Sequence, residues 1–216
     1  MSEAESNRVS MRLLDASVKD KLRKLFEELE GKLGIEGLSV TLFTVIMELV
    51  GNAVKANLKR AFFSRNQYDL DDPESYAAGM DAFKQNYDRI QKEEYVHALE
   101  ELELVVTVEV DLDNDRLLTY VENNTLLLHN EERRIRKKLS SAMDAEELAE
   151  FYMNYGDDME GSGLGLAMIV FLIREIGFNP GNFRVYYEDT RTIARLEFPL
   201  NTDYIPIRER GLNSAG

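Results

Sequence analysis

The sequence of 216 residues contains no cysteine. Disulfides, cysteine-based zinc sites and thiol nucleophiles are therefore excluded. The first ten residues are polar and acidic, and they lack the basic and then apolar pattern of a secretory signal. Both absences agree with a cytoplasmic protein, which we take as the expected location.

Positive charge is scarce relative to negative charge. Lys and Arg number 26 against 40 Asp and Glu, which gives a formal net charge of −14. The average surface therefore repels the phosphates of nucleic acids and of anionic membranes. The longest apolar stretch, 164–176, contains Arg174 and Glu175 and is too short to cross a bilayer. We expect no nucleic-acid partner and no membrane partner.

Hydrophobic periodicity predicts helices that precede and interrupt a set of strands. The predicted helices cover 9–31, 41–63, 74–101, 131–139, 145–152 and 164–176. The predicted strands cover 104–110, 117–121, 183–188 and 192–198. Short turns join these strands in pairs, as antiparallel neighbours require. The pattern predicts an α+β fold, a two-layer sandwich whose mixed, mostly antiparallel sheet carries helices on one face.

Domain boundaries follow from the same pattern. We expect an N-terminal helix within 1–34, one main domain over 35–200 and a C-terminal tail over 201–216. A long helical insertion, about 64–101, divides the main domain, either as a docking surface or as added core. The first helix could pack on its own domain or pair with its copy in a homodimer.

One stripe of the helix over 41–63 concentrates groups that suit a metal and phosphates. Glu48, Asn52, Lys55 and Lys59 fall within about 60° of one another on a helical wheel. An amide oxygen is a hard donor suited to Mg²⁺, a carboxylate can take a proton, and ammonium groups suit phosphate oxygens. The alternative is the ordinary polar face of a surface helix.

A glycine loop precedes the apolar helix over 164–176. Gly161, Gly163 and Gly165 alternate with Ser162 and Leu164. Such glycines let backbone amides approach an anion, and the helix start adds unpaired N–H groups. No Gly-Lys-Ser/Thr follows, so the loop is not a P-loop, and its spacing does not fit a dinucleotide fingerprint. The alternative is a loop whose last glycine permits tight helix packing.

Taken together, these two segments resemble the GHKL superfamily of ATP-binding domains. Residues 48–55 (ELVGNAVK) resemble its N box, and residues 161–167 (GSGLGLA) resemble its second glycine box. The histidine-kinase branch matches best, and residues 196–200 (LEFPL) resemble the end of that domain. The resemblance implies a Bergerat-type fold, ATP and ADP as ligands, Mg²⁺ as cofactor and a role in signal transduction.

The resemblance also implies residue roles. Asn52 would ligate Mg²⁺, Glu48 would act as general base or hold a water, and Lys55 would contact phosphate. Gly161, Gly163, Leu164 and Gly165 would line the triphosphate. Residues 126–160 would form a lid whose basic run, 133–138, is available to phosphates. The alternative for that run is a solvated helix face that pairs with Glu131 and Glu132.

Two departures from the family pattern bear on function. The strand over 117–121 leads into Glu122-Asn123-Asn124 where the family has Asp-x-Gly-x-Gly. Asn123 would stand at the adenine-binding Asp position, where its amide oxygen can accept a hydrogen bond without the strength of a charge. Sensor kinases carry their phosphoacceptor histidine on a helix that precedes the ATP-binding domain. Neither of the two histidines here, His97 and His129, lies in the first predicted helix.

Three functions follow from these features. The first is a kinase or ATPase that binds Mg-ATP and phosphorylates a partner protein in signalling. The second is a non-catalytic regulatory module built on the GHKL fold. The third is a structural adaptor that acts through its helical insertion.

Overall fold

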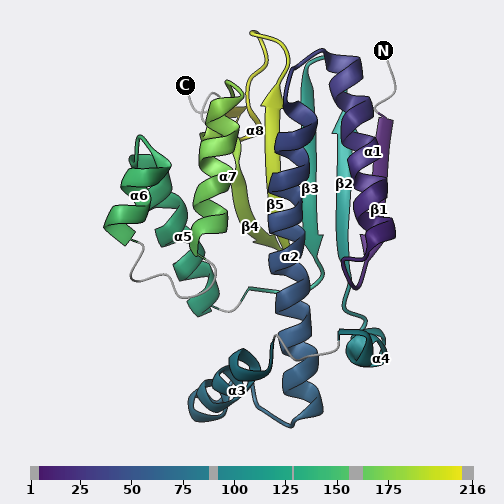
Figure 1. Ribbon diagram of the computed structural model, residues 1–216, viewed down its shortest axis with the longest axis vertical. Helices are drawn as coiled ribbons and strands as arrows, with labels where there is room; N and C mark the ends of the chain where they lie inside the picture. The colour runs from purple at the N-terminus through teal and green to yellow at the C-terminus, as the bar shows by residue number, and fades with distance from the viewer. Residues whose placement is uncertain (1–4, 88–91, 128, 156–162, 211–216) are drawn as a thin grey trace.

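The computed structural model describes residues 5–87, 92–127, 129–155 and 163–210. One five-stranded sheet and a layer of helices make up most of the structure (Figure 1), which confirms the predicted α+β architecture but adds one strand to the four predicted. The strands run in the spatial order β1 (Glu5–Met11), β2 (Val106–Leu112), β3 (Arg116–Asn123), β5 (Arg191–Pro199) and β4 (Arg184–Glu188). Each of these neighbouring pairs is antiparallel, so the predicted mixed sheet is wrong for the described strands.

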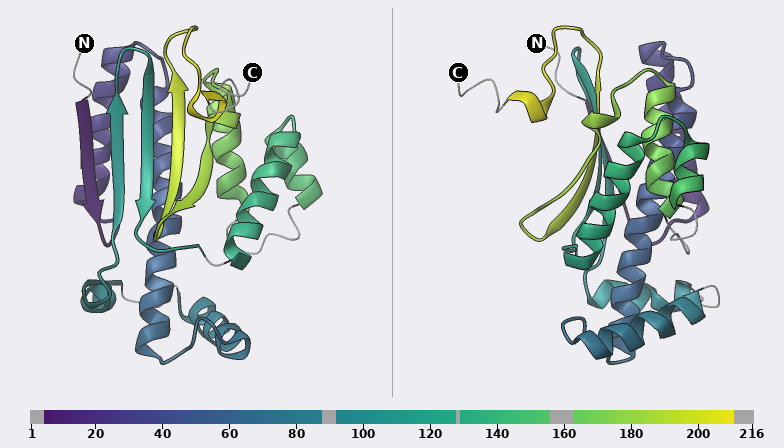
Figure 2. Two further views of the ribbon diagram at one scale, coloured as in Figure 1. Left: turned by 180° about the vertical axis from the view of Figure 1, so that it is seen from behind. Right: turned by 90° about the vertical axis from the view of Figure 1, so that its left-hand side faces the viewer.

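Three helices cover one face of the sheet: α1 (Ala16–Leu33), α2 (Leu38–Arg65) and α7 (Gly163–Glu175) (Figures 1 and 2). The strands turn alternate side chains toward these helices, which explains why Val106, Val108 and Val110 are all fully buried. On α2, Ile46 and Val50 meet this face with no exposed surface. Each such side chain contributes roughly 1.5–3 kcal/mol of hydrophobic burial.

The N-terminal segment corrects one prediction. Residues 5–11 form β1, an edge strand whose Val9 lies opposite Val108 of β2, whereas the periodicity predicted a helix from Val9 onward. The helix begins at Ala16, where the Asp15 side chain accepts a hydrogen bond from the Val18 N–H at 2.8 Å. The alternation of apolar Val9 and Met11 with polar Ser10 covers too few residues to distinguish a strand from the first turn of a helix.

The remaining helices lie at the margins of this sandwich. The predicted helix over 74–101 consists of α3 (Pro73–Asn86), a 3-10 turn (Lys92–Tyr95) and α4 (Val96–Glu101), all near the C-terminal end of α2. Helices α5 (His129–Asp144) and α6 (Leu148–Tyr155) lie beside α7. A second 3-10 turn (Pro180–Asn182) precedes β4.

The segment after β5 adds an element to the opposite face of the sheet. The sequence showed no clear element after Pro199, yet α8 (Ile207–Arg210) lies there (Figure 2). The Ile207 N–H and the Tyr204 hydroxyl both donate to Oε1 of Glu197, each at 2.8 Å. These contacts place the segment over the outer face of β5.

Helix α2 is long and apolar enough to cross a membrane by length and composition alone. The core helix of a soluble protein passes the same test, and α2 packs against the sheet and against α1 and α7. We therefore read α2 as the central helix of the core.

Candidate functional site

Glu48 and Asn52 lie on consecutive turns of α2, and both are half-buried. The Asn52 side-chain amide donates to Oε1 of Glu48 at 2.9 Å. This bond uses the nitrogen of the amide and leaves its oxygen, the atom that could bind a cation, outside the bond. The predicted carboxylate and amide thus form a preordered pair.

The start of α7 lies against this pair. A Cβ atom added to Gly165 would come within 1.8 Å of Oε1 of Glu48. Only glycine fits this approach without displacing the carboxylate, so the closeness of the two helices explains the residue type. The two segments that the sequence singled out therefore meet in space. Gly163 and Leu164 begin α7, whereas Gly161 lies outside the described residues.

Asn123 ends β3 and is almost fully buried, at 6% exposure. Its side-chain N–H group faces the carbonyl oxygen of Ala53 on α2 at 3.4 Å, and its Oδ1 has no hydrogen-bond partner. Because a carbonyl can only accept, this contact fixes which end of the amide faces α2. An unpaired acceptor is left, buried beside the helix that carries Asn52.

The loop after β3 is held by hydrogen bonds from its own and neighbouring side chains. Asn124 accepts from the Val105 N–H at 2.8 Å and donates to the Glu103 carbonyl at 2.6 Å. On β5, Thr192 lies opposite Asn123 and donates to the Thr125 carbonyl at 2.6 Å. Asn124 and Thr192 therefore hold this loop to its neighbours on both sides.

The two lysines of the α2 stripe are both engaged. The Lys55 ammonium lies 4.6 Å from the centre of the Tyr87 ring. Lys59 is buried and forms a salt bridge with Glu131 of α5. Burial lowers the pKa of Lys59, while the charge of Glu131 and its hydrogen bond oppose that change. Each ammonium group would have to leave its present contact to bind a phosphate.

Helix α5 and the segment before it are tied to α2. Arg60 donates to the Leu126 carbonyl, next to the salt bridge between Lys59 and Glu131. Within α5, Arg136 pairs with Glu132 at 2.7 Å. This ion pair agrees with the alternative reading of the basic run 133–138, a helix face that pairs with Glu131 and Glu132. Arg133 and Arg134 are exposed.

The two histidines lie apart from the Glu48–Asn52 pair in the chain. His97 is on α4, 83% exposed, with its Nε2 3.3 Å from Glu101. His129 begins α5. Among the described residues, no group of three or more His, Asp or Glu side chains is placed to hold a metal. A magnesium ion at Asn52 would therefore depend on phosphate and water oxygens for its other ligands.

Asn57 is a polar residue that the sequence analysis did not single out. It lies in the core-facing stripe of α2, is fully buried, and neither of its polar side-chain atoms has a hydrogen-bond partner. The available signal was an amide among apolar residues at core-facing helical positions, one turn after Ala53.

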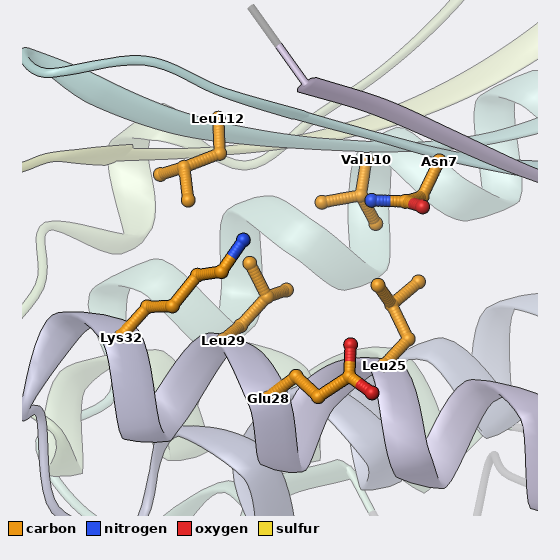
Figure 3. A pocket seen from close by; sticks show the side chains of 7 residues that line it. All are labelled: Asn7, Leu25, Glu28, Leu29, Lys32, Val110 and Leu112. Atoms are coloured by element: carbon orange, nitrogen blue, oxygen red, sulfur yellow. The ribbon is translucent and has the colours of Figure 1, made fainter.

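A small cavity of about 120 Å³ lies elsewhere, between α1 and the strands β1 and β2 (Figure 3). It is lined by Asn7, Leu25, Glu28, Leu29, Lys32, Val110 and Leu112. None of the predicted site residues is among them, so this cavity is separate from the site on α2.

No protein-family model matches the chain, and no solved structure matches it. It is 31% identical over 159 residues to an uncharacterized protein of Treponema pallidum (strain Nichols). The matching region is 73% of this chain but 31% of that protein, so the chain spans less than a third of the relative's length.

Proposed function

We propose that this chain is a cytoplasmic, histidine-kinase-like domain that binds Mg-ATP and phosphorylates a partner protein in signalling. The observation that carries the proposal is the meeting of Glu48, Asn52 and Gly165, because these residues belong to the two segments that resemble nucleotide-binding boxes. The proposal assigns the chain a Bergerat-type variant of the α+β sandwich. The five-stranded antiparallel sheet, with its helices on one face, supports this assignment.

The residues at the site suit the ligands that the proposal requires. The unpaired, buried Oδ1 of Asn123 can accept a hydrogen bond from the amino group of adenine. The Asn52 amide oxygen is the kind of neutral, hard ligand that Mg²⁺ takes. Bound Mg²⁺ would neutralise charge on the phosphates. Asn52 would hold the ion, and the Gly163–Gly165 turn at the start of α7 would offer backbone N–H groups to the phosphates.

Glu48 is the residue proposed to move a proton. Its carboxylate accepts from Asn52 and lies against Gly165, so both neighbours fix its position. In this role its oxygen takes a proton from the attacking hydroxyl of a partner protein or of water. The exposed surface of His97 and its place on α4 give no support to autophosphorylation within this chain.

A second function, a non-catalytic regulatory module, is favoured by a different observation. Lys55 lies over the Tyr87 ring and Lys59 pairs with Glu131, so the cations of the α2 stripe are already engaged. The ties made by Asn124 also stand where the family has flexible glycines. A module of this kind would keep the fold and would still bind a partner protein, but it would neither bind nor hydrolyse ATP.

Titration calorimetry with ATP and with ADP, each with and without Mg²⁺, distinguishes the two functions. We expect magnesium-dependent binding by the native protein and its loss in Asn52→Ala. Glu48→Gln should keep binding and lose any phosphoryl transfer or hydrolysis. If millimolar nucleotide produces neither heat nor a shift in melting temperature, the enzyme proposal is wrong and the regulatory module stands.

A further inference from the structure

The positive charge of the chain is unevenly distributed, and its densest part lies on α5. Five of the 26 Lys and Arg residues fall within 133–138, a segment that contains no acidic residue. The formal net charge of the whole chain is −14. Helix α5 lies at the outer margin of the molecule, beside α7 (Figures 1 and 2). It therefore carries a compact cationic face on an otherwise acidic protein.

The cationic face of α5 is one side of the helix and consists of Arg133, Arg134, Lys137 and Lys138. At about 100° per residue, these four side chains fall within an arc of about 140°. The first three are exposed, and the fourth is half-buried. Apolar side chains on the opposite side of α5 pack against the core, namely Ile135, Leu139 and Ala142. Because this apolar side packs toward α7, the cationic face turns away from α7.

Like charges are neighbours on this face. Lys137 follows Arg133 by four residues, so the two lie on consecutive turns. Lys138 follows Arg134 in the same way, and like charges at this spacing destabilise a helix. Burial lowers the pKa of Lys138, and the charge of Arg134 lowers it further. The sequence thus keeps an arrangement that opposes the stability of its own helix, which is typical of a functional surface.

The acidic residues of the first turn of α5 are already paired elsewhere. Glu131 forms its salt bridge with the buried Lys59 of α2, and Glu132 binds Arg136 on the other side of α5. Within the described part of the chain, no carboxylate forms an ion pair with Arg134, Lys137 or Lys138. The cationic face can therefore take its counter-charges from another molecule.

The size of the face favours a short acidic protein segment over a membrane or a nucleic acid. Residues on consecutive turns are about 6 Å apart along a helix, which is less than the Debye length of about 8 Å at physiological salt. An anionic bilayer or a DNA duplex would also bring its charge against the acidic remainder of the chain and be repelled. A single helical segment places its carboxylates on the face alone, at the same spacing, and Arg binds carboxylates through two parallel hydrogen bonds.

We propose that the cationic face of α5 binds an acidic helical segment of a partner protein, one that presents carboxylates on consecutive turns. These carboxylates neutralise the repulsion between the cations of neighbouring turns. A partner bound here contacts the helix that Glu131 ties to α2. The inference does not depend on nucleotide binding, and it gives the chemistry of the partner for the kinase and for the regulatory module alike.

Two double variants with equal changes in charge test the proposal. Arg134→Ala/Lys137→Ala removes two cations from the face, and Lys21→Ala/Lys24→Ala removes two exposed cations from α1 as the control. The probe is a labelled, alanine-rich helical peptide with glutamates on consecutive turns of one side, and a second peptide carries glutamine at the same positions. Binding is followed by fluorescence anisotropy at low and at physiological salt, without nucleotide, and each protein is also melted.

We expect the native protein and the α1 variant to bind the glutamate peptide with about equal affinity. The α5 variant should bind it about tenfold more weakly, since each lost ion pair contributes a factor of a few. The glutamine peptide should not bind, and added salt should weaken the binding of the glutamate peptide. The α5 variant should melt no lower than the α1 variant, because the substitutions remove repulsion within the helix.

Other results would overturn the inference in separate ways. If the native protein does not bind the glutamate peptide, or if both variants bind it equally well, the α5 face is not an acidic-segment site. If phosphatidylserine vesicles or a DNA oligonucleotide bind the α5 face more tightly than the peptide does, the partner is a membrane or a nucleic acid instead. If the α5 variant melts well below the α1 variant, these cations have partners within the chain. None of these results bears on nucleotide binding, which the calorimetry tests separately.

Discussion

Polar residues are buried on both faces of the sheet, but the two faces differ in how many of these residues have hydrogen-bond partners. On the outer face, Glu197 accepts from Arg195 at 3.2 Å and from Tyr204 and the Ile207 N–H at 2.8 Å each. On the inner face, the side chains of Asn57 and Thr119 have no hydrogen-bond partner at all. The buried charged pair Arg195–Glu197 is hydrogen-bonded on the outer side, whereas the neutral Asn57 and Thr119 side chains are unpaired on the inner side.

The difference distinguishes a structural role on the outer face from the binding role that we propose for the inner face. A paired, buried carboxylate holds the segment after β5 in place, and its bonds are complete without a ligand. Unpaired amides and hydroxyls reduce stability unless something else satisfies them. The outer network is not fully paired, since Nε of Arg195 and Oδ1 of Asp111 lack partners, but each of those side chains has at least one bond.

The largest effect on stability is expected from the outer face. Glu197→Ala removes the acceptor for three donors and leaves the guanidinium of Arg195, which is 10% exposed, without its carboxylate. Breaking a buried pair in this way should cost about 3–5 kcal/mol in the free energy of unfolding. Urea denaturation measures it, with Glu188→Ala as the control, because Glu188 is exposed and should change stability by less than about 0.5 kcal/mol.

A large loss of function with a smaller loss of stability is expected at the meeting of α2 and α7. Gly165→Ala places a methyl group where the Glu48 carboxylate lies, so the carboxylate must move and its bond with Asn52 breaks. We expect magnesium-dependent nucleotide binding to fall at least tenfold and the unfolding free energy to fall by about 1–3 kcal/mol.

Gly31→Ala is the control for this variant. Gly31 lies in α1 with open space around its Cβ position, so alanine there should stabilise the protein by about 0.5–1 kcal/mol and leave binding unchanged. Equal nucleotide affinities in Gly165→Ala and in the native protein would show that the Glu48–Gly165 contact has no part in binding.

The outer face should also show a pH dependence of stability at high pH. Burial, together with the hydrogen bond to Glu197, raises the pKa of Tyr204 from its usual value of 10 to about 12. Between those two values the unfolded chain loses the phenol proton and the folded chain keeps it, so stability falls as pH rises from 10 to 12. Tyr204→Phe should show a shallower fall over this range, and identical slopes for both proteins would contradict the account.

The smallest expected effect, and one of opposite sign, lies on the inner face. Thr119→Val removes an unpaired hydroxyl from the middle of β3 without changing its shape, and valine suits a strand. We expect a gain of about 1 kcal/mol in the free energy of unfolding. A loss of stability would mean that the hydroxyl has a partner, and the contrast between the two faces would weaken.

The sequence predicted the central elements because their patterns are local. Strand β2 was expected over 104–110 and lies at Val106–Leu112, and the helix that contains Glu48 was found nearly whole. The i,i+4 bond between Glu48 and Asn52 follows directly from helical spacing. Strand β1 was missed because its pairing with β2 joins residues about 100 positions apart in the sequence.

The contacts of Lys55 and Lys59 could not be predicted for a related reason. Lys55 lies over Tyr87 from the insertion, and Lys59 pairs with Glu131 from α5, so each depends on a segment whose placement no local pattern shows. The position of Tyr204 and Ile207 on Glu197 likewise follows only from the fold of the final segment. The family resemblance implied that both segments serve one site, but it did not predict the direct approach of Gly165 to Glu48.

Observation of the asparagine side chains by NMR tests the central claim most directly. The side-chain N–H₂ signals of Asn52 and Asn123 can be assigned with single variants and followed during a titration with Mg-ADP. We predict that these two signals move together and saturate, while the signal of the exposed Asn201 stays in place. If the two signals stay unmoved at saturating nucleotide, the inner face does not form a nucleotide site and the account is wrong.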